Sequence, residues 1–221
     1  MFSKDFGIEQ YDSSQYLELL DQIEKRCPVS HVVAGGLGIA GLIGRQIRET
    51  HDLDLIIDQA NKEEMQIYLK EGGYRRLDQD EEDKLLKGGG MVFTNNEGLR
   101  IDVVSGIFSD EGLNLQFAEG NLFIPRIGLG VEAVLDDISF LTFSPEVFYF
   151  LKNRATRRLP WQTISLFNRK QDKTDYLVLK KIIDPQRAQE LLEAGFSYTG
   201  RHPGITQLKQ LFFSMFPNRT E

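Results

Sequence analysis

The sequence is poor in the residues that build disulfide frameworks and zinc sites. It contains one cysteine, Cys27, and three histidines, His31, His51 and His202. A single cysteine excludes an internal disulfide and any zinc site built on several thiolates, and the histidines show no close metal-ligand spacing. Cys27 is therefore expected to be a small apolar residue at a helix end, in a reducing compartment.

Long apolar runs are also missing. No stretch approaches the roughly 20 apolar residues that a membrane helix needs. The first twelve residues are acidic and carry no apolar stretch after Lys4, which a signal peptide would require. The sequence therefore predicts a soluble, cytoplasmic protein with no membrane partner.

Positive charge is in short supply overall. Lys and Arg total 26 against 33 Asp and Glu, so the formal net charge is −7, which argues against a strongly basic binder of polyanions. The charge is uneven, however: residues 145–181 hold nine cations and three acids, a balance of +6 that leaves −13 for the rest. Basic and aromatic residues alternate there, which is compatible either with RNA contacts or with a helical core under a solvated face.

The overall composition, with 41% hydrophobic and 27% charged residues, is that of an ordinary globular protein. The spacing of apolar residues, the helix-capping residues and the glycines that end helices predict alternating helices and strands up to residue 70, followed by a β-rich segment and then by helices. The expected helices are 14–27, 37–43, 62–70, one starting at 145, 169–183, 185–194 and 203–216. The expected strands are 31–34 and 53–57, a hairpin of 91–94 with 99–104, and irregular β-structure over 106–143.

This order of elements predicts an α+β fold. An α+β half, residues 1–140, is followed by a helical half, residues 141–221, and the character of the sequence changes near Ser144-Pro145, a typical helix start. The phenylalanines of the last predicted helix are expected to form core or the face of a possible homodimer.

The most informative residues are Asp52 and Asp54. On a strand, residues two apart point to the same face about 6.5–7 Å apart, so Leu53 and Leu55 would face the core while both carboxylates share the other face. Like charges beside an apolar sheet are costly, and a divalent cation such as Mg²⁺ is the usual remedy. The alternative is a pair of exposed carboxylates at a strand end.

A third acid, Asp102, lies within the aliphatic strand 99–104. If this strand neighbours that of Asp52 and Asp54, three carboxylates converge, which suffices to hold two Mg²⁺ ions and leave one carboxylate near a nucleophile. The alternative for Asp102 is a salt bridge to Arg100 or Arg75.

A glycine pair, Gly35-Gly36, stands between the first strand and a short helix. Backbone N–H groups at such a helix start can bind phosphate oxygens, although a glycine pair is also compatible with a simple tight turn. The order strand, Gly-Gly, short helix, Arg48, Asp-x-Asp and a later strand Asp is a specific arrangement.

These residues resemble the minimal nucleotidyltransferases, with the closest similarity to aminoglycoside and lincosamide adenylyltransferases and related nucleotidyltransferase toxins. The likeness covers residues 31–58 and 99–104. It implies a mixed β-sheet core flanked by helices and a C-terminal helical domain. It also implies Mg²⁺-dependent transfer of a nucleoside monophosphate from an NTP to an acceptor hydroxyl, with ATP as the expected NTP.

By the same resemblance, each motif takes a role. Gly35, Gly36 and Arg48 would bind the nucleotide; Asp52, Asp54 and Asp102 would bind two Mg²⁺ ions, and Asp102 would also assist the metals or act as general base.

The C-terminal resemblance is carried by residues 144–152, which end in Lys152, and by a basic Asp-x-x-Asp segment that starts at Arg169. Lys152 and Arg169 are predicted to contact phosphates. Related antibiotic-modifying enzymes often carry an aromatic residue and an acid at positions that are Leu37 and Ala40 here. The acceptor therefore stays open between a small molecule and tRNA or protein, and a non-catalytic nucleotide- or partner-binding relative is the alternative to an enzyme.

Overall fold

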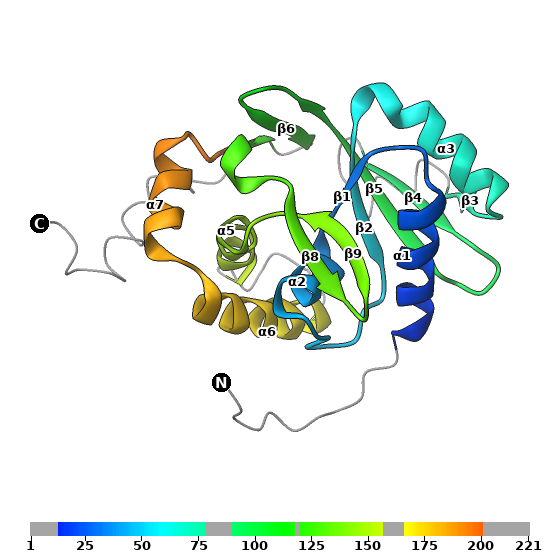
Figure 1. Ribbon diagram of the computed structural model, residues 1–221, viewed down its shortest axis with the longest axis horizontal. Helices are drawn as coiled ribbons and strands as arrows, with labels where there is room; N and C mark the ends of the chain where they lie inside the picture. The colour runs from blue at the N-terminus through cyan, green and yellow to red at the C-terminus, as the bar shows by residue number, and fades with distance from the viewer. Residues whose placement is uncertain (1–12, 78–89, 118–119, 157–165, 201–221) are drawn as a thin grey trace, which may run out of the picture.

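The computed structural model describes residues 13–77, 90–117, 120–156 and 166–200, which fold around one mixed sheet (Figure 1). Its helices are α1 (Ser14–Arg26), α2 (Gly35–Ile43), α3 (Lys62–Glu71), α5 (Pro145–Thr156), α6 (Leu166–Ile182) and α7 (Pro185–Glu193), with 3-10 turns η1 (Gln59–Asn61) and η2 (Arg126–Gly128). Its strands are β1 (His31–Val33), β2 (Leu53–Asp58), β3 (Arg75–Arg76), β4 (Gly90–Thr94), β5 (Arg100–Phe108), β6 (Gly112–Phe117), β7 (Gly120–Pro125), β8 (Val131–Leu135), β9 (Ile138–Thr142) and β10 (Ser197–Gly200).

The ten strands of the described residues form a single mixed sheet. Its main path runs β10-β7-β6-β5-β2-β1-β9-β8; off this path, β4 pairs with the first half of β5 and β3 pairs with β4. β2 is parallel to β5, whereas β1 is antiparallel to β2 and parallel to β9. The α+β fold predicted from the order of elements, and the mixed sheet implied by the family resemblance, are thereby confirmed.

Most of the predicted elements appear close to their expected bounds. The helix start at Ser144-Pro145 is observed, with the Ser144 hydroxyl accepting a hydrogen bond from the Val147 N–H at 3.4 Å. The strand β10 was not predicted, because its four residues lack an apolar alternation and it is held by antiparallel pairing with the distant β7. The predicted helix 203–216 lies outside the described residues, and the division at residue 140 stays a prediction.

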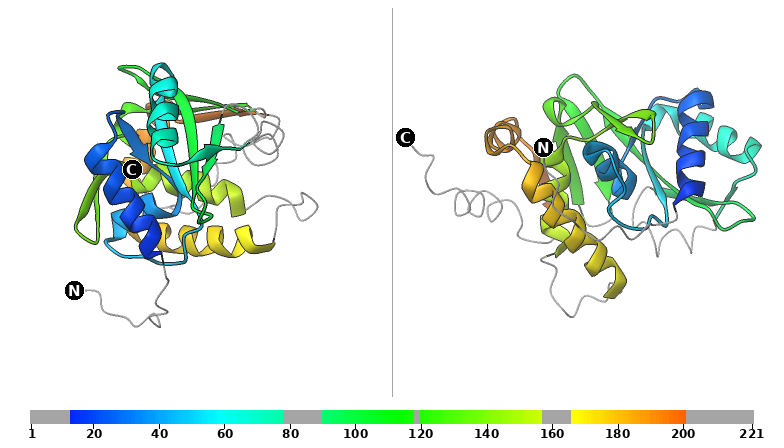
Figure 2. Two further views of the ribbon diagram at one scale, coloured as in Figure 1. Left: turned by 90° about the vertical axis from the view of Figure 1, so that its right-hand side faces the viewer. Right: turned by 60° about the horizontal axis from the view of Figure 1, so that its bottom comes forward.

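Two apolar clusters cover the two faces of the sheet. One contains α1, α3 and the side chains of Leu53, Leu55 and Ile57, and the other contains α5, α6, α7 and Ile56. Figures 1 and 2 show α1 and α3 on one side of the molecule and α5, α6 and α7 on the other. Since strand side chains alternate, Asp54 points toward the face of the C-terminal helices.

The aromatic residues of the basic stretch belong largely to this second cluster. Phe148, Tyr149 and Phe150 are buried, and the rings of Tyr149 and Tyr176 stack with centroids 5.3 Å apart, joining α5 to α6. They agree with the helical-core interpretation rather than with a stacking surface for RNA. No helix in the described part of the chain is long and apolar enough to cross a membrane.

The start of β1 is fastened to α1 through His31. Its ring nitrogens lie 2.9 Å from the Glu24 carboxylate and 2.8 Å from the Val29 carbonyl. Burial alone would lower the pKa of His31, but hydrogen bonds to Cys27, Glu24 and Val29 outweigh burial and raise that pKa to about 10. A histidine with a raised pKa stabilises the folded state fully below its unfolded pKa of 6.5, and this contribution is lost as the pH rises through about 10.

The substitution Glu24→Gln tests this contact. We expect the free energy of unfolding at pH 6 to fall by about 1–3 kcal/mol, because a buried charged hydrogen bond is lost, and the deficit to shrink as the pH approaches 10. Urea unfolding at pH 6, 8 and 10 measures both effects. The matched control is Asp21→Asn on the same helix, whose exposed pair with Lys25 is worth less than about 0.5 kcal/mol. A deficit that stayed constant from pH 6 to pH 10 would contradict the assignment.

Candidate functional site

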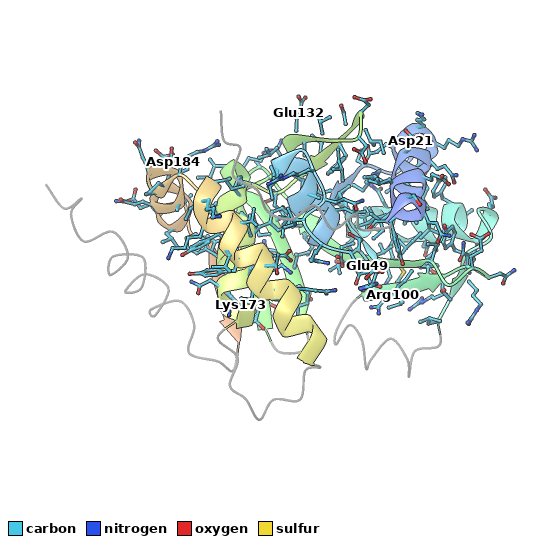
Figure 3. All side chains as sticks on the ribbon, turned by 90° about the horizontal axis from the view of Figure 1, so that it is seen from below. Asp21, Glu49, Arg100, Glu132, Lys173 and Asp184 are labelled. Carbon is cyan, nitrogen blue, oxygen red and sulfur yellow. The ribbon has the colours of Figure 1, made fainter. Side chains whose placement is uncertain are left out.

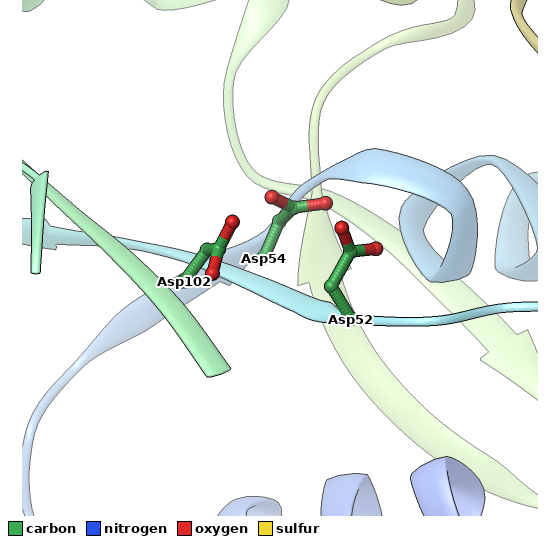
Figure 4. Close-up of side chains that lie close together, drawn as sticks. All are labelled: Asp52, Asp54 and Asp102. Atoms are coloured by element: carbon green, nitrogen blue, oxygen red, sulfur yellow. The ribbon is translucent and has the colours of Figure 1, made fainter. Parts of the chain in front are cut away.

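The parallel pairing of β2 with β5 brings the three predicted acids together. Asp54 lies directly opposite Asp102, and the register of the neighbouring pair places Asp52 level with Arg100. One carboxylate oxygen from each of Asp52, Asp54 and Asp102 lies within 4.8 Å of the other two (Figure 4). The expected convergence of these side chains is therefore present, with Asp102 buried and the other two half-buried.

The electrostatics of this cluster favour a bound cation. Burial, together with the nearby carboxylates of Asp52 and Asp102, raises the pKa of Asp54 to about 8, against the opposing effect of Lys152 and Arg100. Burial likewise raises the pKa of Asp102, although Arg100 acts in the opposite direction. Three carboxylates that repel one another are a hard-oxygen donor set of the kind that Mg²⁺ prefers, so the residues present fit such an ion.

Asp102 also makes the salt bridge that was the alternative interpretation of this residue. Arg100 donates from Nε to Oδ1 at 2.6 Å and from Nη2 to Oδ2 at 2.5 Å. A carboxylate oxygen has two lone pairs, so this bidentate pair fixes the orientation of Asp102 and leaves accepting capacity on both oxygens. The two interpretations of Asp102 are thus compatible.

The glycine pair at the start of α2 packs against the acid-bearing strand. Gly35 has a φ of +58°, and a Cβ atom on it would overlap the carboxylate of Asp54. A Cβ atom on Gly36 would lie 2.7 Å from Nη2 of Arg48, and the N–H of Ala34 donates to the carbonyl of Asp54 at 2.8 Å. The carboxylate of Asp54 thus occupies the space beside Gly35, and the guanidinium of Arg48 occupies the space beside Gly36.

Arg48 and Lys152, both predicted to contact the nucleotide, are paired with acids of α6. Arg48 donates to Asp175 from Nε at 2.9 Å and from Nη2 at 3.2 Å. Lys152 lies 2.7 Å from Asp172 and 3.0 Å from Asp175. The two cations are therefore held on the side of the acid cluster that faces the C-terminal helices.

Arg169, the other predicted phosphate contact, is placed by the structure in the first turns of α6, and its side chain lies outside the described residues. Figure 3 looks from below onto this side of the molecule, where Glu49 lies in the segment before β2, Arg100 begins β5 and Lys173 belongs to α6.

The contacts that α1 makes beside the acid cluster were not predicted. The hydroxyl of Tyr16 donates to the carbonyl of His51 at 2.6 Å and accepts from the N–H of Arg100 at 3.3 Å. The N–H of Thr50 donates to the hydroxyl of Ser13 at 3.1 Å. These bonds fix the backbone just before Asp52 and Asp102, and they join residues too distant in the chain for local patterns to reveal.

Solved structures with this fold include two antibiotic adenylyltransferases. The lincosamide antibiotic adenylyltransferase LnuA, bound to lincomycin, has a TM-score of 0.57 at 19% identity and covers 78% of this chain and 99% of its own. ANT(2'')-Ia in complex with adenylyl-2''-tobramycin has a TM-score of 0.57 at 16% identity and covers 82% of this chain and 94% of its own. At these identities the likeness shows the fold alone. No curated protein sequence matches the chain significantly.

The sequence profile of one family matches more than half of the 221 residues. It is described as aminoglycoside-2''-adenylyltransferase and matches residues 15–134, which include the glycine pair and all three clustered acids. The resemblance predicted from residues 31–58 and 99–104 is thereby confirmed. The chain belongs to the aminoglycoside-2''-adenylyltransferase family.

Proposed function

We propose that the protein is a Mg²⁺-dependent nucleotidyltransferase that moves AMP from ATP to an acceptor hydroxyl and releases pyrophosphate. The observation that carries the proposal is the convergence of Asp52, Asp54 and Asp102 beside the glycine pair at the start of α2. Membership of an adenylyltransferase family supports the same reaction class.

In this proposal the residues of the chain hold the metal ions and bind the phosphates of the nucleotide. Asp52, Asp54 and Asp102 would hold two Mg²⁺ ions, which supply positive charge to the reacting phosphate and to the departing pyrophosphate. The N–H groups at the start of α2 bind phosphate oxygens, and Arg48 and Lys152 provide cationic charge beside them. Arg169 is proposed as a further phosphate contact.

Asp102 is proposed to receive the proton of the acceptor hydroxyl. The acceptor oxygen then forms a bond to the α-phosphorus while the bond from that phosphorus to the bridging oxygen of pyrophosphate breaks. Arg100 keeps the Asp102 carboxylate in one orientation, because both of its oxygens accept from the same guanidinium.

The acceptor is proposed to be a small hydroxyl-bearing molecule of the antibiotic class. The family name and the ligands of the two neighbouring structures support this class. The two positions that depart from the antibiotic-modifying pattern, Leu37 and Ala40, are buried in the core and offer no contact to an acceptor. The burial of Phe148, Tyr149 and Phe150 speaks against a stacking platform for tRNA on α5.

Pyrophosphate release tests the proposal directly. The protein is incubated with Mg²⁺, each of four NTPs, and separate aminoglycoside, lincosamide, tRNA and protein acceptors, with EDTA as the control. Release that needs Mg²⁺, ATP and a small hydroxyl compound is the expected result. Release only with tRNA or protein would reassign the acceptor. Silence with every acceptor, together with measurable NTP binding, would favour a non-catalytic nucleotide-binding relative.

A further inference from the structure

A fully buried carboxylate, that of Asp175, lies where three segments of the chain meet. It comes from α6 and has no solvent-exposed surface. Its two oxygens accept from Nε and Nη2 of Arg48, which precedes β2, and Oδ2 lies 3.0 Å from Nζ of Lys152 of α5. One carboxylate thus fixes two cations whose positions in the chain differ by more than a hundred residues.

The two cations and their partners balance in charge. Arg48 and Lys152 face Asp172 and Asp175, since Nζ of Lys152 also lies 2.7 Å from Asp172. Burial alone would lower the pKa of Lys152, but the charges of Asp175 and Asp172 outweigh burial and raise that pKa. Both cations consequently stay charged although most of their surface is removed from water.

Both cations also adjoin the acid cluster. The guanidinium of Arg48 fills the space beside Gly36 in the first turn of α2, and the charge of Lys152 acts on Asp54. Long side chains without a fixed partner would sample many rotamers, or would pair with Asp52 and Asp54 and compete with a metal for them. The buried carboxylate of Asp175 instead engages both cations in salt bridges.

We propose that Asp175 is a positioning residue that holds Arg48 and Lys152 in place for the triphosphate of the Mg²⁺–NTP complex. It contacts no substrate itself and acts through the two cations. The inference rests on the proposed function, because the nucleotide is the ligand that these cations would meet.

The first test measures nucleotide binding without turnover. The dissociation constant for Mg²⁺ and an ATP analogue that cannot be cleaved between the α- and β-phosphates is measured by calorimetry for the wild type and for Asp175→Asn. We expect Asp175→Asn to bind about 10- to 100-fold more weakly, the usual effect of removing a residue that orients a binding group. The matched control is Glu18→Gln, the same change of charge at an exposed position of α1, which should bind as the wild type does.

A double-mutant cycle separates positioning from a general loss of stability. If Asp175 acts through Arg48 and Lys152, then Asp175→Asn should weaken binding by a clearly smaller factor in the background of Lys152→Met than in the wild type, because one of the two positioned cations is already gone. Fully additive losses would overturn the proposal. In steady-state kinetics the KM for ATP should rise more than kcat falls, whereas a purely structural role would lower the melting temperature and leave the KM unchanged.

If Asp175→Asn does not fold, Asp175→Glu replaces it in the binding measurement. It keeps the negative charge but shifts the carboxylate by about one carbon–carbon bond, so we expect binding at least about fivefold weaker, and unchanged binding would overturn the proposal. The wild type is measured first. If the wild type does not bind the Mg²⁺–nucleotide complex, the proposed function itself is contradicted. If the wild type binds the complex and Asp175→Asn binds it equally well, only the role of Asp175 is contradicted.

Discussion

Replacing Asp54 by asparagine is expected to reduce nucleotidyl transfer by at least about a thousandfold. Asp54 is the central acid of the cluster, lying opposite Asp102 in the sheet register and two residues from Asp52. A neutral amide binds Mg²⁺ much more weakly than a carboxylate does. The charge of a metal ion at a reacting phosphate stabilises the transition state by several kcal/mol, and each 1.36 kcal/mol corresponds to a tenfold change in rate. Transfer of label from α-labelled ATP to the acceptor measures the loss, and retained transfer would refute the metal assignment.

The same substitution should make the metal-free protein more stable. A carboxyl group whose folded pKa is raised destabilises the folded state once the pH exceeds its unfolded pKa of 3.8, and for Asp54 that cost grows up to about pH 8. At pH 7 in EDTA we therefore expect Asp54→Asn to raise the free energy of unfolding by about 1–3 kcal/mol.

Stability and activity should thus change in opposite directions. The control is Asp110→Asn, an exposed acid in the turn between β5 and β6, which should change neither quantity. An Asp54→Asn protein that is inactive and also less stable in EDTA would point to misfolding rather than to loss of a metal ligand.

The sequence could predict the acids of the site because their signal is local. Two carboxylates that alternate with leucines at a strand start must share one face, and an acid within an aliphatic run needs a partner. The convergence of the three acids required that β2 and β5 be neighbours, and the parallel register of Asp54 with Asp102 meets this condition.

The partners of the cations were beyond the sequence for the opposite reason. Arg48 and Asp175 are 127 residues apart, and no local pattern encodes such a pairing. Residues 145–181 carry a surplus of +6, yet Lys152 of this segment pairs with Asp175, which also pairs with Arg48 from the acidic half of the chain. Net charge by segment therefore describes composition, while the field at the site depends on pairs that form only in the fold.

Replacing Gly35 by alanine is expected to lower transfer by at least about a hundredfold and the free energy of unfolding by about 1–3 kcal/mol. The backbone of Gly35 has a φ of +58°, which L-residues adopt at a cost, and the added methyl group would overlap the Asp54 carboxylate. Asp54 is short and sits on a strand, so it can make room only by leaving its position, and a displacement of about 1 Å can cost a hundredfold in rate.

Gly44→Ala provides a control at the C-terminal cap of the same helix. Gly44 ends α2 with a φ of +73°, and a Cβ atom on it would meet nothing within 4 Å. It should therefore share the backbone cost of about 1–2 kcal/mol but keep the wild-type kcat and KM. Urea unfolding and the pyrophosphate assay on both variants separate backbone strain from displacement of Asp54. If the two alanine variants lost activity equally, the glycine pair would serve only to shape the turn, and the close approach of Gly35 to Asp54 would have no catalytic role.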